Sequence, residues 1–178
     1  DSAAVVPAAG WKLSANVTYN LNPSSVPSSV GSSNLATIAA DAFGNWQAAI
    51  GSKVTFSRGA DTSMNRTAYD GRNIVAFNRI SPSALGITYI RYYPSTGAVV
   101  DVDTILNKRY AWSWSNSSTC ADANSFDVQD ILTHETGHWM GLDDTYEAAY
   151  VDNTMYGYGS KGEVKKNTLT TGDVAGVS

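Results

Sequence analysis

The stretch HETGHWMGLDD, residues 134–144, contains both histidines of this 178-residue chain. Two histidines four residues apart lie on the same face of a helix, about one turn from each other, so His134 and His138 can direct their imidazole nitrogens at a single metal ion. Glu135 then lies beside the ion, where a carboxylate can accept a proton from water without being a ligand. The pattern therefore predicts a helical zinc site with Glu135 as its general base.

A third zinc ligand should follow shortly after the helix, because a catalytic zinc keeps three protein ligands and one open position. Gly141 can adopt the left-handed conformation that ends a helix and turns the chain back toward the ion. The residue that such a turn most simply returns to the ion is Asp144. Asp143 is the weaker candidate, and we expect it to contact solvent at the helix end.

The complete pattern HExxHxxGxxD resembles the signature of the metzincins, a class of zinc endopeptidases. Most metzincins carry a third histidine where this chain has Asp144, whereas snapalysin-type bacterial proteases carry the same aspartate. A second stretch, NTMYGY at residues 153–158, resembles the methionine turn beneath the zinc ligands of that class, with Met155 as its methionine. Together with LTTGDVAGV at residues 169–177, it is similar to the tail of the matrixins.

The resemblance implies a zinc-dependent endopeptidase that hydrolyses extended polypeptides. The site residues that it implies are the zinc ligands His134, His138 and Asp144, the catalytic Glu135, and the supporting residues Gly141 and Met155. It also implies that substrate pairs with the sheet edge at residues 84–93, and that Tyr156, Gly157 and Tyr158 contribute to a substrate pocket. The Met-x-Tyr spacing of astacin-like and serralysin-like enzymes is absent, so neither tyrosine is assigned a catalytic role.

Periodicity along the chain predicts an α/β (α+β) fold. Residues 35–50 repeat apolar side chains at the helical period, with Ser33 or Asn34 as the expected cap and Gly51 as the stop. Asp127 is the expected cap of the zinc helix. The predicted strands cover residues 16–21, 53–58, 73–80, 84–93 and 98–107. This order resembles the matrixin catalytic domain, which implies a twisted five-stranded mixed sheet, one long backing helix, an active-site helix and a C-terminal helix.

Composition favours one catalytic domain over residues 1–178, because 43% hydrophobic content suffices for one sizeable core and no low-complexity linker divides the chain. The metzincin resemblance implies an upper part of about residues 1–141 and a lower part of about residues 142–178. A net charge of −4 without a basic cluster argues against nucleic acid or a membrane as partner. We expect a secreted monomer whose export segment has been removed, since residues 1–9 lack a signal-like core.

Two other features leave alternatives open. Asp101 and Asp103 alternate on a predicted strand and so face the same way, which suits either a calcium site or a solvated strand face. Cys120 is the only cysteine and excludes an intramolecular disulfide. We expect an incidental thiol there, with a metal ligand or an intermolecular disulfide as the alternatives.

Two other functions fit the same motif. A catalytically silent binding protein could keep the metzincin scaffold with structural zinc, but such a site has no need of the non-ligand carboxylate of Glu135. A zinc hydrolase acting on a substrate other than peptides is the second alternative. The methionine stretch and the edge strand available for peptide pairing disfavour it.

Overall fold

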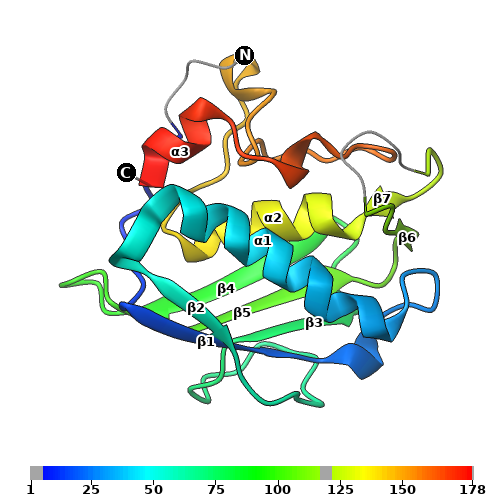
Figure 1. Ribbon diagram of the computed structural model, residues 1–178, viewed down its shortest axis with the longest axis horizontal. Coiled ribbons are helices and arrows are strands. Elements are labelled where there is room, and N and C mark those ends of the chain that lie inside the picture. Colours follow the sequence, from blue (N-terminus) through cyan, green and yellow to red (C-terminus); the bar gives the residue numbers. More distant parts are fainter. Residues whose placement is uncertain (1–5, 117–121, 178) are drawn as a thin grey trace.

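The computed structural model describes residues 6–116 and 122–177, so Cys120 lies outside the described residues. Its sheet and helices form layers, with two long helices above the sheet and the C-terminal helix beyond them (Figure 1). The strands are β1 (Asn16–Leu21), β2 (Thr55–Arg58), β3 (Ile74–Asn78), β4 (Gly86–Tyr92), β5 (Val99–Asn107), β6 (Trp112–Ser113) and β7 (Phe126–Asp127). The helices are α1 (Leu35–Ile50), α2 (Val128–Trp139) and α3 (Thr171–Val177).

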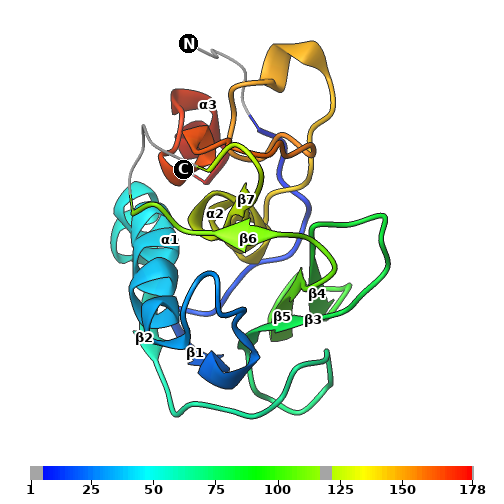
Figure 2. The same ribbon diagram turned by 90° about the vertical axis from the view of Figure 1, so that its right-hand side faces the viewer.

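The sheet contains five strands in the order β2-β1-β3-β5-β4. The pairs β1 with β2, β1 with β3, and β3 with β5 are parallel, and β4 runs antiparallel to β5. The predicted fold, a mixed five-stranded sheet with three helices, is therefore confirmed. The short strands β6 and β7 form a separate parallel pair in front of α2 (Figure 2). Because β4 ends the sheet order, one of its edges has no partner strand among the described residues.

Helix α1 covers one face of the sheet and packs beside α2 (Figure 1). Its predicted stop is confirmed, since Gly51 has a φ of +70° and its N–H donates to Gln47 O. Asn34 is the N-cap residue, as predicted, but its side chain makes no capping hydrogen bond and donates instead to Val30 O at 2.6 Å. A 3-10 turn over Ser32–Asn34 leads directly into the helix. No helix in the described ranges is long and apolar enough to cross a membrane.

Helix α2 begins at its predicted cap, where the Asp127 side chain accepts a hydrogen bond from Asp130 N at 3.0 Å. The helix is tied to α1 by a 2.8 Å hydrogen bond from Trp46 Nε1 to Thr133 O. Side chains from other segments pack closely against α2 at Gly137. A Cβ there would overlap Met155 Sδ and lie 2.8 Å from Trp46 Cζ2. This close packing fixes the position of the helix that carries both histidines.

The expectation of a solvated face at Asp101 and Asp103 is wrong, because these residues of β5 are only 0% and 1% exposed. Their carboxylates accept hydrogen bonds from the N–H groups of Asp70 and Gly71, and of Ala68 and Ile74, respectively. Arg91 Nη1 lies 3.4 Å from Asp101 Oδ1 and 3.7 Å from Asp103 Oδ2. We therefore assign the pair to anchoring the loop between β2 and β3.

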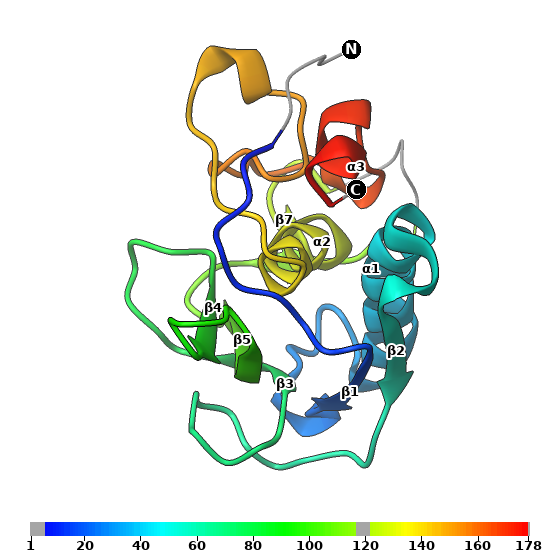
Figure 3. The same cartoon turned by 90° about the vertical axis from the view of Figure 1, so that its left-hand side faces the viewer.

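The N-terminal segment, residues 6–12, runs past the end of α2 toward β1 (Figure 3). It forms hydrogen bonds with three separate parts of the chain. These bonds run from Val6 N to Gly172 O (3.3 Å), Ala9 N to Gly141 O (2.6 Å), Asp143 N to Pro7 O (3.3 Å), Trp11 Nε1 to His138 O (2.5 Å) and Lys12 N to Gly97 O (2.7 Å). The segment therefore joins α3, the turn after α2, and the turn between β4 and β5.

A buried charged cluster lies between α2 and the C-terminal stretch. The Asp130 carboxylate accepts a hydrogen bond from Lys166 N at 2.8 Å, and Lys166 Nζ lies 2.9 Å from Glu163 Oε1. Lys166 is 1% exposed, and its ammonium also donates to Tyr158 O at 2.6 Å. Burial, followed by the hydrogen bond and negative charge of Glu163, raises the pKa of Asp130 to about 9. At neutral pH Asp130 therefore keeps its proton.

This cluster predicts a stability that falls as pH rises. Folded Asp130 holds its proton up to about pH 9, whereas the ordinary pKa of an aspartate is 3.8, so the folded state binds more protons between these two pH values. The contribution of Asp130 to the free energy of unfolding is fully present below pH 3.8, and it is lost as the pH rises to about 9. In Asp130→Asn the amide can donate to Glu163 at every pH. The free energy of unfolding of the variant, relative to wild type, should therefore increase by up to about 1.4 kcal/mol per pH unit.

Denaturant unfolding of both proteins from pH 6 to 9 measures this difference. Asp41→Asn, at an exposed carboxylate of α1, is the control and should run parallel to wild type throughout. Parallel profiles for Asp130→Asn and wild type would contradict the raised pKa of Asp130.

Candidate metal and catalytic site

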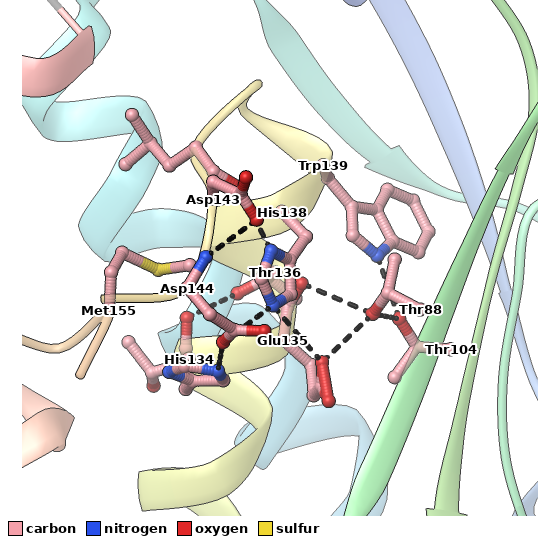
Figure 4. Close-up of polar contacts among 12 residues, drawn as sticks. Thr88, Thr104, His134, Glu135, Thr136, His138, Trp139, Asp143, Asp144 and Met155 are labelled. Carbon is pink, nitrogen blue, oxygen red and sulfur yellow. Dashed lines mark hydrogen bonds and ion pairs between the residues drawn. The ribbon is translucent and has the colours of Figure 1, made fainter. Parts of the chain in front are cut away.

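The two histidines of α2 direct their rings at one carboxylate. His134 Nε2 lies 2.8 Å from Asp144 Oδ1, and His138 Nε2 lies 3.3 Å from the same oxygen (Figure 4). The histidines share a helix face because they are one turn apart, and Asp144 returns to them after the helix has ended. The structure thus brings together the three groups that the sequence suggested as metal ligands.

Both imidazoles are oriented by backbone carbonyls. His134 Nδ1 lies 2.7 Å from Thr154 O, and His138 Nδ1 lies 2.9 Å from Leu142 O. A carbonyl oxygen can only accept, so each Nδ1 carries the hydrogen and each Nε2 keeps its lone pair in the neutral ring. This is the tautomer in which Nε2 can bind a metal ion, and the carbonyls hold the rings toward it.

The electrostatics of the three groups favour one positive charge between them. Burial opposes a charge on His138, but its hydrogen bond to Asp144 and the negative charges of Glu135 and Asp144 outweigh it and raise the pKa of His138 to about 9. Burial likewise disfavours ionised Asp144, but the hydrogen bonds and charges of the two histidines hold the pKa of that carboxyl well below its usual range. A metal cation can replace the proton that the group attracts.

The donor set suits zinc. Within the described residues, one group of three or more His, Cys, Asp or Glu side chains is compact enough to hold a metal: His134, Glu135 and His138, with ligand atoms all within 4.8 Å of one another. Two imidazole nitrogens and a carboxylate oxygen form a common catalytic zinc ligand set. Ligands about 2.0–2.1 Å from a tetrahedral zinc lie about 3.3 Å apart. The 3.3 Å between His138 Nε2 and Asp144 Oδ1 matches that spacing.

Glu135 lies beside these groups. Unlike the two imidazoles, its side chain is not held by a backbone carbonyl among the described residues. Its Oε2 is 3.8 Å from His138 Nε2, and the residue is 5% exposed. Its carboxylate lies at the junction of two cavities, of about 430 Å³ and about 390 Å³, which both include Asp144 in their walls. A carboxylate placed there can exchange a proton with water next to the metal ligands.

The turn after α2 separates the roles of the two neighbouring aspartates. Gly141 has a φ of +89°, and a Cβ there would lie 2.5 Å from Trp11 O. The turn leaves Asp143 exposed, where its Oδ1 accepts a hydrogen bond from Asp144 N at 2.9 Å. Asp144 points toward the histidines instead (Figure 4). The geometry therefore favours Asp144 over Asp143 as a ligand.

Met155 lies beneath the histidine helix and is fully buried. It packs against Gly137, and the preceding residue, Thr154, supplies the carbonyl that orients His134. Asp173, at the start of α3, accepts hydrogen bonds from Thr154 N at 2.9 Å and from Met155 N at 3.3 Å. The C-terminal helix thereby fixes the segment that supports His134.

The segment after Met155 forms a wall of the 390 Å³ cavity, as the sequence suggested. Tyr156, Gly157 and Tyr158 line it together with His134 and Glu135. The rings of Tyr156 and Tyr158 pack edge to face, with centroids 5.6 Å apart. The structure therefore places a largely aromatic wall next to the candidate metal ligands.

Sequence reasoning missed two residues of this region. Tyr146 lines the same cavity, packs against Tyr158 with ring centroids 5.1 Å apart, and lies beside Asp144, and burial followed by the charge of Asp144 raises its pKa. Its position two residues after Asp144 is a signal that could have identified it. Trp11 lines the 430 Å³ cavity from the N-terminal segment. No local pattern connects it to a site 127 residues away.

Comparison with known proteins agrees with this geometry. The family model for matrixins, the M10 peptidases, matches residues 10–178. No match was found among curated proteins. The compact group of His134, Glu135 and His138 fits the zinc site of the metzincins, the class to which matrixins belong. The chain therefore belongs to the matrixin family of zinc metallopeptidases.

Proposed function

We propose that this protein is a zinc-dependent endopeptidase that cleaves extended polypeptides. The observation that carries the proposal is the convergence of His134 Nε2 and His138 Nε2 on one oxygen of Asp144, with the Glu135 carboxylate beside them at the junction of two cavities. A purely structural zinc site would have a closed set of four ligands and no such neighbouring carboxylate. This contrast disfavours the silent binding scaffold.

His134, His138 and Asp144 would hold the zinc ion. When bound, zinc lowers the pKa of adjacent water toward neutrality and polarises a carbonyl group. The Glu135 carboxylate accepts the proton of the attacking water and then delivers it to the leaving amine. Gly141 and Met155 act indirectly, because the first turns Asp144 back to the histidines and the second packs under their helix as a methionine turn.

The substrate would pair with the unpaired edge of β4. An extended peptide at a strand edge is held by main-chain hydrogen bonds, which define its register without selecting its sequence. Gly86, Thr88 and Ile90 of β4 line the 430 Å³ cavity, and Gly86 also lines the 390 Å³ cavity. One side chain of the peptide would enter the second cavity and contact Tyr156, Gly157 and Tyr158 there.

The remaining parts of the proposal concern the whole molecule. Residues 1–178 would form one catalytic domain, with the substrate groove between an upper part of about residues 1–141 and a lower part of about residues 142–178. The protein would act as a secreted monomer, and polypeptides would be its partners. Matrixins are generally extracellular, which supports secretion.

Cleavage of casein by the purified protein tests the proposal. We expect about one zinc per chain, cleavage that stops when a zinc chelator such as dipicolinate is added, and recovery when zinc is restored. Bound zinc without cleavage of casein or of any peptide in a mixed library would favour the binding scaffold and refute the proposed activity. Full cleavage in a metal-free sample would refute the metal mechanism.

A further inference from the structure

A chain of polar side chains leads from the interior of the protein to the Glu135 carboxylate (Figure 4). It begins at Trp139, the last residue of α2, crosses Thr104 of β5 and Thr88 of β4, and ends at Glu135. Its hydrogen bonds are Trp139 Nε1 to Thr104 Oγ1 (2.8 Å), Thr104 Oγ1 with Thr88 Oγ1 (2.7 Å) and Thr88 Oγ1 to Glu135 Oε2 (3.1 Å). The two threonines are direct cross-strand partners in the sheet.

The direction of every bond in this chain follows from its two ends. The Trp139 indole N–H can only donate, and an ionised Glu135 carboxylate can only accept. Thr104 therefore accepts from Trp139 and donates to Thr88, and Thr88 donates to Glu135. Trp139 and Thr104 are both 0% exposed, so water does not compete for the hydroxyl of Thr104. The hydrogen of the Thr88 hydroxyl is thereby left for Glu135, whose Oε2 at 3.1 Å is the nearer acceptor and whose backbone oxygen lies at 3.3 Å.

Strand β4 contacts the same carboxylate at a second point. A Cβ added at Gly86 would lie 3.1 Å from Glu135 Oε1 and 3.3 Å from Glu135 Cγ. The glycine thus allows Glu135 to lie directly against the strand, two residues before Thr88. One carboxylate oxygen is held by a hydroxyl and the other is flanked by backbone, which leaves the side chain little freedom to change rotamer.

We propose that Thr88 is a positioning residue that orients the general base, and that Thr104 and Trp139 fix the hydroxyl of Thr88 for that purpose. This inference rests on the proposed function, because it gives Glu135 a reaction in which orientation matters. A general base must lie within hydrogen-bond reach of the proton that it removes, and a displacement of about 1 Å can cost 10²-fold in rate. The strand proposed to pair with substrate would therefore also orient the base.

Thr88→Val tests the inference, because valine keeps the branched shape and loses the hydroxyl. We expect kcat to fall about 10- to 100-fold, as for other residues that orient a site through hydrogen bonds, with KM and zinc content within about twofold of wild type. Thr88→Ser restores the hydroxyl and should recover kcat to within about threefold. Thr18→Val is the control, since Thr18 is an exposed strand threonine whose hydroxyl lies 3.5 Å from that of Ser57.

Two further variants make the test independent of one substitution. Thr88→Ala also lacks the hydroxyl and introduces no new contact, so it carries the same expectation if Thr88→Val does not fold. Gly86→Ala places a methyl group 3.1 Å from Oε1 and 3.0 Å from Leu106 Cδ2, and because Gly86 lines both cavities it should lower kcat and also raise KM. Wild-type kcat in zinc-loaded Thr88→Val or Thr88→Ala would overturn the inference while the proposed function stands. A zinc-loaded wild-type protein without turnover would overturn the proposed function itself.

Discussion

Replacing Glu135 by glutamine is expected to lower kcat by about 10²- to 10⁴-fold, the range that general acid–base catalysis contributes. The amide keeps the size of the side chain and can still accept from Thr88, which now lies 3.1 Å from Glu135 Oε2. It cannot take a proton from water. Because Glu135 is not a proposed ligand, zinc content should remain near one per chain and KM should change little. Steady-state kinetics and metal analysis of the same sample measure both effects.

Glu147→Gln is the matched control, since Glu147 is exposed three residues after Asp144 and contacts neither histidine in the described structure. It should keep wild-type kcat. Peptidase activity of Glu135→Gln within tenfold of wild type would show that another group removes the proton. A variant that has lost zinc would instead indicate that Glu135 is a ligand.

Replacing Asp144 by alanine should weaken zinc binding by at least about 100-fold, since altering a group that only supports a ligand already costs 10- to 100-fold. Asp144 Oδ1 lies 2.8 Å and 3.3 Å from the two Nε2 atoms, and its loss leaves both imidazoles without their partner. Peptidase activity should then appear only at high added zinc. Titration of the metal-free protein with zinc, in the presence of a competing chelator, measures the change in affinity.

Asp143→Ala provides the internal comparison, because it removes the same charge one residue earlier in the chain. Asp143 is exposed and contacts Asp144 N, so we expect zinc affinity within about threefold of wild type. Equal losses in the two variants would mean that charge in the turn matters more than ligand identity. A larger loss in Asp143→Ala would make Asp143 the third ligand.

The parts of the site that could be predicted from sequence depend on short-range geometry. The position of His138 relative to His134 follows from helical periodicity, and the start of α2 follows from a cap three residues from its hydrogen-bond partner, Asp130. The strands, too, were located because β-branched and aromatic residues suit them, although several predicted boundaries extended one or two residues too far. Periodicity constrains neighbours within a few turns and says little beyond them.

The parts that sequence reasoning missed depend on contacts between distant segments. Asp101 and Asp103 resemble a solvated strand face until the loop between β2 and β3, about thirty residues earlier, covers them with backbone N–H groups. Thr88 meets Glu135 only because β4 lies beside α2. No local sequence pattern around the two aspartates or around Thr88 indicates these contacts. Such pairings are decided by sheet order and helix packing, which a local pattern does not encode.

The N-terminal segment gives the protein a mechanical property. Residues 6–12 form hydrogen bonds with the turn that carries Asp144 and with α3. A part of the chain that is far away in sequence therefore holds the candidate metal site in place. Because these hydrogen bonds come from successive residues, shortening the chain from Val6 to Trp11 would release them one after another and leave the bond of Lys12 N to Gly97 O. Shortening would therefore loosen the turn that carries Asp144 in steps, and the length of the segment would set how firmly Asp144 is held beside the two histidines.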